Sequence, residues 1–243
     1  LILISFSSLS SAKLDINSPV DGKVTSLMLV GNSFFYYNNS LHNHLGNLIK
    51  NDPNVTSMKR RSITINGSDL PWHDIESYLS NDQIGSFRID TKNNNKYVPS
   101  SNTKIDAVIF MGCSLCPIHP DTKDTFQVYV KSYSEIIREK NAEPMLFMSW
   151  PYKNKPEMID SLRDVFIDTA NKNNLLLIPA GEAFHRFNLN HPEIDLYTKD
   201  LRHPSKEGTY LAAAVVFATL YGKATAGTVS YTHLTLPTTR CGV

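Results

Sequence analysis

Residues 23–35, KVTSLMLVGNSFF, combine an apolar strand pattern with an abrupt polar end at Gly31-Asn32-Ser33. An apolar run that stops at turn-forming residues and continues into a helical pattern predicts a buried strand followed by a helix. In α/β proteins, ligands usually bind at the carboxyl edge of the sheet. The Ser33 hydroxyl is therefore expected at that edge, where a nucleophile would lie. Asn and Ser are also favoured at turns and helix N-caps, so for this tripeptide alone an ordinary turn is the favoured interpretation.

Four further apolar segments are each followed by a helical pattern. They are residues 58–66, 105–111, 144–150 and 174–179, and the expected helices cover 39–50, 69–79, 125–140, 158–170, 181–187 and 204–221, the last with Pro204 in its first turn. Strands that alternate with amphipathic helices predict a parallel sheet covered on both faces. We therefore expect an α/β protein with a three-layer α/β/α, flavodoxin-like fold and a five-stranded parallel sheet. The polar residues 81–104 predict a long connection with a short edge hairpin.

The composition is that of an ordinary globular domain. The 243 residues are 41% hydrophobic and 19% charged, and the formal net charge is +1. Phosphate binding requires clustered Lys and Arg, so nucleic acid is not an expected partner. No apolar segment reaches the roughly 18 to 20 residues that would span a bilayer, so we expect no stable membrane insertion. A single domain is expected over residues 13–228, and the oligomeric state is left open.

The two ends of the chain differ from the rest. Residues 1–12, LILISFSSLSSA, fit the back half of a secretory signal with a small-residue cleavage site, which predicts export to the periplasm or outside the cell. A strand-like or irregular amino end is the alternative. Residues 229–243, VSYTHLTLPTTRCGV, follow a natural helix stop at Tyr221-Gly222 and look like a translated sequencing-adapter tail. We interpret them as a non-native tail without functional information.

A serine nucleophile requires a base and a group that orients the base. Asp200-Leu201-Arg202-His203, just before the last expected helix, offers both on one loop. His203 would act as the general base, and Asp200 would fix its tautomer. Taken singly, a surface histidine and a turn aspartate are the simpler interpretations.

The spacing of Cys113 and Cys116 leaves several interpretations open. A C-x-x-C pair could carry redox chemistry, form a structural disulfide or consist of two buried thiols, and the last two are favoured because no thioredoxin-like pattern surrounds it. No further ligands at close spacing suggest a metal site, so neither a metal nor another cofactor is expected.

The ordered blocks resemble those of the SGNH (GDSL-like) hydrolases. Gly31-Asn32-Ser33, a glycine after the second strand and Asp-x-x-His before the last helix carry the likeness, and DLRHPSKEGTYLAAA at 200–214 is similar to an exported branch of that superfamily. The resemblance implies that Ser33 is the nucleophile and that Asp200 and His203 are its acid and base. It also implies that the N–H of Gly67 lies in the oxyanion hole, where fixed donors are strong.

The third block departs from that family. An amide side chain is usual there, whereas this strand ends in Met111-Gly112-Cys113-Ser114. Ser114 could donate a weaker bond, or the hole could work with two backbone donors and Asn32, which predicts a roughly hundredfold slower enzyme. Trp150 after the fourth strand could line a substrate cleft or simply close the core.

These patterns favour an exported serine esterase acting on an ester of a carbohydrate or small molecule, with acetylated carbohydrate preferred by analogy alone. The alternative is a non-catalytic ligand-binding domain on the same fold, suggested by the missing amide. A redox role for the C-x-x-C pair is a third possibility.

Overall fold

The computed structural model describes residues 14–15, 24–81, 87–99 and 104–222. The expected leader at 1–12 and the expected foreign tail at 229–243 lie outside these ranges. No helix within them is long and apolar enough to cross a membrane.

Strand β1 (Ser26–Gly31) lies inside a five-stranded parallel sheet, and all six of its residues are buried. It pairs with the second strand on one side and with the third on the other. The order is β2 (Lys59–Thr64), β1, β5 (Ala107–Phe110), β6 (Glu143–Phe147) and β7 (Leu176–Ile178). Counted along the chain, this is the flavodoxin-like order 2-1-3-4-5, so the predicted fold class is confirmed.

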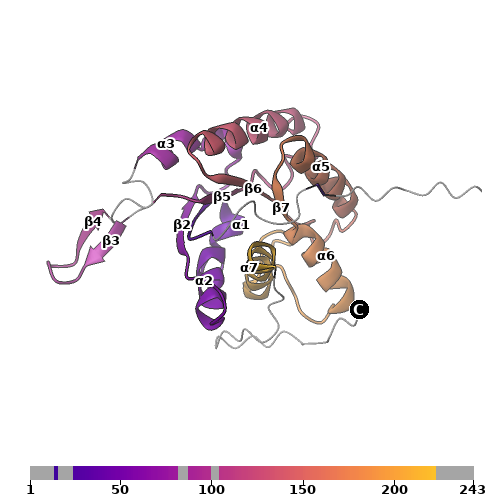
Figure 1. The fold of residues 1–243 in the computed structure, drawn as a ribbon. Helices are drawn as coiled ribbons and strands as arrows, with labels where there is room; N and C mark the ends of the chain where they lie inside the picture. The colour runs from indigo at the N-terminus through magenta and orange to yellow at the C-terminus, as the bar shows by residue number, and fades with distance from the viewer. Residues whose placement is uncertain (1–13, 16–23, 82–86, 100–103, 223–243) are drawn as a thin grey trace, which may run out of the picture.

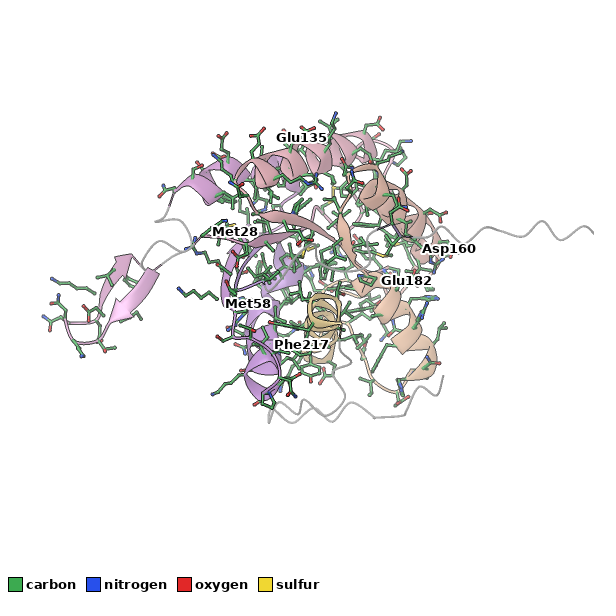
Figure 2. All side chains as sticks on the ribbon, in the orientation of Figure 1. Met28, Met58, Glu135, Asp160, Glu182 and Phe217 are labelled. Carbon is green, nitrogen blue, oxygen red and sulfur yellow. A yellow bond between two sulfur atoms is a disulfide. The ribbon has the colours of Figure 1, made fainter. Side chains whose placement is uncertain are left out.

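Successive side chains of a strand point to opposite faces of the sheet, which divides the core in two. Leu27 and Leu29 belong to one apolar cluster, whereas Met28 and Val30 belong to the other. Figure 2 shows side chains filling the space on both sides of the sheet. Helices α2 (Leu41–Asn51), α6 (Ala180–Asn190) and α7 (Lys206–Tyr221) cover the first face, and α3 (Ile75–Ser80), α4 (Lys123–Glu139) and α5 (Met158–Lys172) cover the second (Figure 1).

The strand order reverses between β1 and β5. From β1 the chain crosses to β2 on one side and then returns to β5 on the other. The crevice outside such a switch point is where open α/β sheets bind ligands. Ser33 opens the short helix α1 (Ser33–Tyr36) directly after β1, and Ser114 follows β5, so both lie beside this point.

Two local expectations differ from the structure. Pro204 lies outside the last helix, which begins at Lys206 with Ser205 as its N-cap; Pro204 instead forms a β-bridge with Tyr197. The Ser205 hydroxyl accepts the Gly208 N–H at 3.1 Å, so an ordinary cap starts the helix two residues later. The hairpin expected in residues 81–104 exists, as β3 (Phe87–Asp90) and β4 (Lys96–Pro99). It forms a separate two-stranded sheet, however, and is not an edge of the main sheet.

Candidate active site

Ser33 is presented by the sharp turn between β1 and α1. Asn32 is the N-cap of this helix, and its side-chain oxygen accepts the Phe34 N–H at 3.1 Å. The extended backbone of Asn32 followed at once by helix turns the Ser33 side chain out of the strand direction. Ser33 is 5% exposed, so its hydroxyl lies in a largely desolvated setting.

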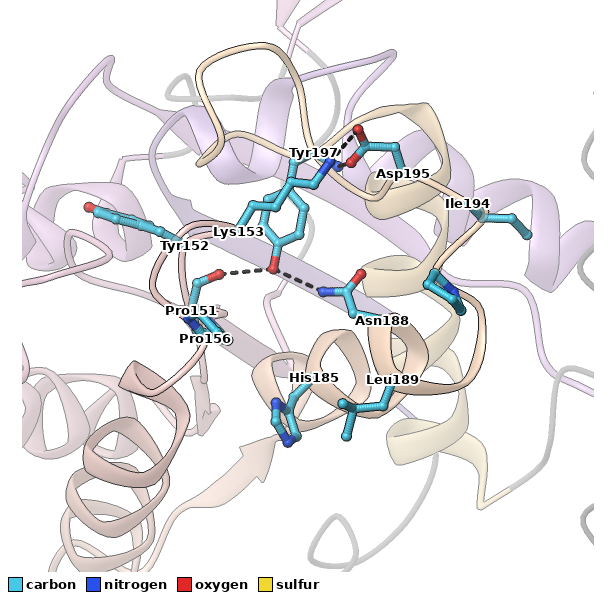
Figure 3. A pocket seen from close by; sticks show the side chains of 11 residues that line it. Pro151, Tyr152, Lys153, Pro156, His185, Asn188, Leu189, Ile194, Asp195 and Tyr197 are labelled. Atoms are coloured by element: carbon cyan, nitrogen blue, oxygen red, sulfur yellow. Dashed lines mark hydrogen bonds and ion pairs between the residues drawn. The ribbon is translucent and has the colours of Figure 1, made fainter.

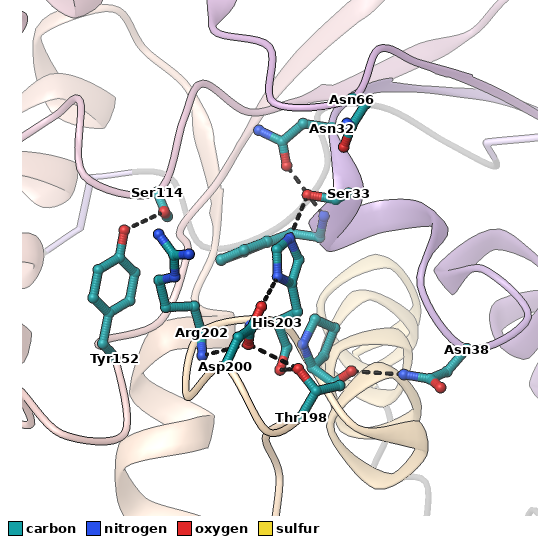
Figure 4. A network of polar contacts seen from close by, with 12 residues as sticks. Asn32, Ser33, Asn38, Asn66, Ser114, Tyr152, Thr198, Asp200, Arg202 and His203 are labelled. Atoms are coloured by element: carbon teal, nitrogen blue, oxygen red, sulfur yellow. Dashed lines mark hydrogen bonds and ion pairs between the residues drawn. The ribbon is translucent and has the colours of Figure 1, made fainter.

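The structure brings Ser33, His203 and Asp200 together in one chain of hydrogen bonds (Figure 4). The Ser33 Oγ lies 2.7 Å from His203 Nε2. On the other side of the ring, His203 Nδ1 is hydrogen-bonded to Asp200 Oδ2. Serine and histidine are separated by 170 positions in the sequence, so only the fold makes this contact. The sequence-predicted residues therefore have the geometry of a nucleophile, a base and an orienting group.

Asp200 is held in its ionised form. Burial alone would raise its pKa, but hydrogen bonds from the His203 ring, the N–H groups of Arg202 and His203 and the Thr198 hydroxyl outweigh it, so the pKa of Asp200 lies well below its usual range. The N–H groups of Arg202 and His203 donate to Asp200 Oδ1 at 3.0 and 2.9 Å, and the Thr198 hydroxyl donates to the same oxygen at 2.8 Å. A carboxylate here keeps the proton on His203 Nδ1, which leaves Nε2 free to accept the Ser33 proton.

The loop that carries Asp200 and His203 is strained at one residue. Leu201 has φ of 65°, a left-handed conformation that costs a non-glycine residue about 1 kcal/mol. The kink lets a single carboxylate accept both following N–H groups. The loop is also fixed from outside, because the Thr198 N–H donates to the His203 carbonyl at 2.9 Å and the Lys153 N–H donates to the Leu201 carbonyl at 2.9 Å.

Two aromatic rings hold the imidazole of His203. The Tyr37 ring stacks on it with centroids 4.2 Å apart and planes 8° apart, and Phe34 meets it edge-on at 5.4 Å. Stacking of this kind limits rotation of the imidazole and places π-electron density over a ring that becomes positive during proton transfer. The sequence does not indicate this contact, because a tyrosine at a helix end gives no sign of which loop it will meet.

Gly67 lies in the turn after β2, with φ of +67° and open space where a Cβ would point. Within the described part of the chain, the N–H groups of Ser33 and Gly67 have no acceptor. Backbone N–H groups left unpaired beside a nucleophile are available to an oxyanion. The role of Gly67 in such a hole remains a prediction.

A buried network supports the Gly67 turn. The Ser68 hydroxyl lies 3.2 Å from the Gly31 carbonyl and 3.0 Å from His73 Nε2, and the Tyr78 hydroxyl is 3.3 Å from the other ring nitrogen. Burial lowers the pKa of His73, so this ring is neutral near pH 7. Ser68 is only 1% exposed, so this second serine–histidine pair is a structural contact shielded from solvent. Nothing in the sequence pattern indicated it.

The amide of Asn32 does not face a substrate. Its Nδ2 donates to the carbonyls of Ser68 at 3.0 Å and Gly112 at 3.1 Å, which uses both of its N–H bonds. The expectation that Asn32 donates to an oxyanion is therefore wrong for this geometry. Asn32 instead ties the turns after β1, β2 and β5 to one another, because it lies between two loops that each present a carbonyl.

Ser114 lies across the site from Ser33, and its hydroxyl is 3.0 Å from the Tyr152 hydroxyl (Figure 4). No amide side chain takes its place among the described residues of this turn, 111–116. Cys113 and Cys116 form a disulfide just beyond it. Together with Asp69 they are the one group of potential metal ligands in the described ranges, but paired sulfurs offer no thiolate, so the group does not fit a metal site.

Trp150 closes the core and does not line a cleft. It is fully buried, and its ring stacks between Phe34 at 4.7 Å and Phe184 at 4.0 Å. Its Nε1 donates to the Arg202 carbonyl at 3.0 Å. The interpretation of Trp150 as a substrate-binding residue is therefore wrong, because α6 and α1 enclose the ring before a ligand could reach it.

A cavity of about 220 Å³ lies on the far side of the Pro151–Tyr152 turn (Figure 3). The Tyr197 hydroxyl sits at its wall between the Pro151 carbonyl at 2.9 Å and the Asn188 amide at 3.2 Å. Tyr152 belongs both to this wall and to the contact with Ser114. None of Ser33, Asp200 and His203 lines this cavity.

Comparisons with known proteins support the fold. No protein-family model and no curated protein matches the sequence. Among solved structures, a protein assigned to the SGNH hydrolases from Slackia heliotrinireducens superposes with a TM-score of 0.60 at 19% identity, covering 81% of this chain and 99% of its own. A DUF4886 family protein from Bacteroides uniformis gives 0.63 at 18% identity, with 88% and 89% covered.

A catalytic mutant of an acetylxylan esterase from Geobacillus stearothermophilus gives a TM-score of 0.58 at 13% identity, with 82% of this chain and 95% of that one covered. At these identities the likeness concerns the fold, and the chain has the three-layer fold of the SGNH hydrolases.

Proposed function

We propose that this protein is a serine esterase that works through a covalent acyl-enzyme. The observation that carries the proposal is the hydrogen-bond chain from Ser33 through His203 to Asp200 at the sheet's switch point. In this chain Asp200 orients the His203 ring, and His203 Nε2 is placed to take the Ser33 proton. The same arrangement is what activates a serine for attack on a carbonyl.

In the first half-reaction, Ser33 Oγ attacks the ester carbonyl carbon while its proton passes to His203 Nε2. The carbonyl oxygen becomes an oxyanion and accepts hydrogen bonds from the N–H groups of Ser33 and Gly67. Asp200 stabilises the imidazolium. The bond to the alcohol oxygen then breaks, and this oxygen takes the proton from His203. In the second half-reaction, water attacks the acyl group through the same base, and the acid leaves as Ser33 regains its proton.

Two features support an ester of a small molecule or carbohydrate as the substrate. One matching solved structure is a catalytic mutant of an acetylxylan esterase, and the triad lies at the carboxyl edge of the sheet, beside the switch point where open α/β sheets bind ligands. Export is supported by the disulfide between Cys113 and Cys116, because disulfides persist mainly in oxidising compartments.

The competing function is ligand binding without turnover on the same fold. The occupied amide of Asn32 and the absence of a third-block amide in residues 111–116 favour it, since only two backbone donors remain. The intact triad argues against it, because binding alone needs no base with its tautomer fixed.

The deciding experiment compares Ser33→Ala with Ser68→Ala, since both remove a hydroxyl bonded to a histidine. With p-nitrophenyl acetate, we expect Ser33→Ala to lose turnover by at least about a thousandfold. Ser68→Ala should retain measurable turnover. Unchanged hydrolysis by folded Ser33→Ala would overturn the proposal.

A further inference from the structure

Arg202 is a charged residue beside the triad that the proposed mechanism does not use. Its side chain is exposed, and its guanidinium has no carboxylate or carbonyl partner in the described part of the chain. Its closest contact is the Tyr152 ring, with Cζ 5.8 Å from the centroid. Four other arginines each have a carbonyl or carboxylate partner: Arg60 with the His42 carbonyl, Arg138 with the Asn173 carbonyl, and Arg163 and Arg186 with Glu182.

The backbone of Arg202 is held rigidly. Its N–H donates to Asp200 Oδ1 at 3.0 Å, and its carbonyl accepts the indole N–H of Trp150 at 3.0 Å. Because the Trp150 ring is fully buried, this anchor cannot shift without disturbing the core. The direction in which the Arg202 side chain leaves the loop is therefore fixed, and less entropy is lost when the guanidinium binds a ligand.

The guanidinium points toward Ser114, on the opposite side of the site from Ser33. Figure 4 shows the Arg202 side chain passing between Tyr152 and His203 toward Ser114. Asp200 cannot neutralise it, since its oxygens are taken by the His203 ring, two N–H groups and Thr198. The carboxylate of Asp195, earlier on the same segment, is paired with Lys153 at 2.7 Å. Among the described residues, the Arg202 guanidinium thus has no ion-pair partner, and it lies next to the reacting groups.

A planar guanidinium binds carboxylates in a bidentate manner. Tyr152 and Ser114 share one hydrogen bond, so one of their two hydroxyl protons remains free to donate beside it. His203 must reach the oxygen of the leaving alcohol, and Arg202 is its neighbour on the same loop. A group bound by Arg202 therefore belongs to the alcohol part of the substrate.

We propose that Arg202 binds a carboxylate on the alcohol part of the substrate, so that the preferred substrates are esters of acid-bearing alcohols such as uronic acids. This inference rests on the proposed esterase function and narrows its substrate class. It follows from the fixed backbone, the unpaired guanidinium and its place beside His203.

The test uses a matched pair of substrates, an acetylated methyl glucuronoside and the corresponding uronamide, which is similar in shape but neutral. Acetate release should give the acid a kcat/KM about tenfold higher with the wild-type protein, as one charge-assisted contact at an exposed site allows. Arg202→Met should bring the ratio near one. Arg202→Lys should keep part of it, because a lysine supplies charge without the fork.

Lys199→Met is the matched control, since it removes one positive charge from an exposed position of the same loop. It should keep the wild-type preference. An equal loss in Lys199→Met would mean that general charge attraction accounts for the effect, and would overturn the proposed contact. If Arg202→Met loses all turnover, the test is the wild-type ratio of kcat/KM for the acid to that for the amide. A ratio near ten that decreases at high salt would support the carboxylate contact, and a ratio near one would overturn it.

The two proposals fail in different ways. Wild-type protein that hydrolyses both compounds at equal rates contradicts the carboxylate site alone. Protein that hydrolyses neither of them, nor p-nitrophenyl acetate, contradicts the esterase function.

Discussion

Replacing Trp150 by phenylalanine tests whether this ring supports the catalytic loop from within the core. The indole is fully buried between Phe34 and Phe184, and its N–H is bonded to the Arg202 carbonyl. The change removes two buried ring carbons, worth about 1.5 kcal/mol at about 0.8 kcal/mol each. The lost hydrogen bond adds about 1 kcal/mol. We therefore expect the free energy of unfolding to fall by about 2.5 kcal/mol.

The measurement is urea unfolding followed by circular dichroism, with the slope checked for two-state behaviour. Trp72→Phe is the natural control, because Trp72 is the other tryptophan and is 62% exposed. It should change the unfolding free energy by less than about 0.5 kcal/mol. Equal costs for the two variants would refute the reasoning. So would a Trp150→Phe protein of unchanged stability but raised KM, since that is the signature of a ring that stacks on substrate.

Four further predictions concern the site and residues outside it. Asp200→Asn should lower kcat/KM by about a thousandfold or more, measured with p-nitrophenyl acetate, because an amide no longer fixes the histidine tautomer. The pKa of Asp200 is lower in the folded protein than in the unfolded chain, so the ionised carboxylate stabilises the fold above the unfolded pKa of about 3.9, and this stabilisation is lost as the pH falls below that value. In acid titration, the free energy of unfolding of Asp200→Asn should therefore fall less steeply than that of the wild-type protein. Identical curves for the two proteins would contradict this prediction. Replacing Cys113 and Cys116 together by serine should lower the free energy of unfolding in urea by about 2 kcal/mol, because the disulfide closes a loop of only four residues. A loss above about 5 kcal/mol would contradict a purely entropic role for the disulfide. Gly67→Ala and Gly222→Ala should each lower the free energy of unfolding by about 1 kcal/mol, because both glycines have a positive φ and open space where a Cβ would point. Only Gly67→Ala should also lower kcat. Equal activities of the two variants would argue against an oxyanion role for Gly67.

The strands of the main sheet were predictable because β1 and β5 are short, mostly apolar runs that end in turn residues. Burial on both faces leaves little freedom in how such runs pack. The separate β3–β4 hairpin was not placed correctly, since its polar sequence indicates a turn but not its partner. Likewise, Pro204 fits a first helical turn as well as the bridge it actually makes.

At the site, the sequence indicated Ser33, Asp200 and His203 because their chemistry is specific and their order matches a known family. The sequence could not indicate which side chains form hydrogen bonds or packing contacts with neighbouring loops. Asn32 has the right chemistry for an oxyanion donor but is used to join three turns, and Trp150 has the right chemistry for a sugar platform but is enclosed by helices. Arg202 became notable only because the described residues offer its guanidinium no carboxylate or carbonyl partner.

The most direct test of the central claim is labelling by a fluorophosphonate, a reagent that modifies activated serines, followed by peptide mapping. One label per molecule is expected on Ser33, and folded His203→Ala should be labelled far more slowly. Folded wild-type protein that stays unlabelled, or carries the label on Ser68, would contradict it.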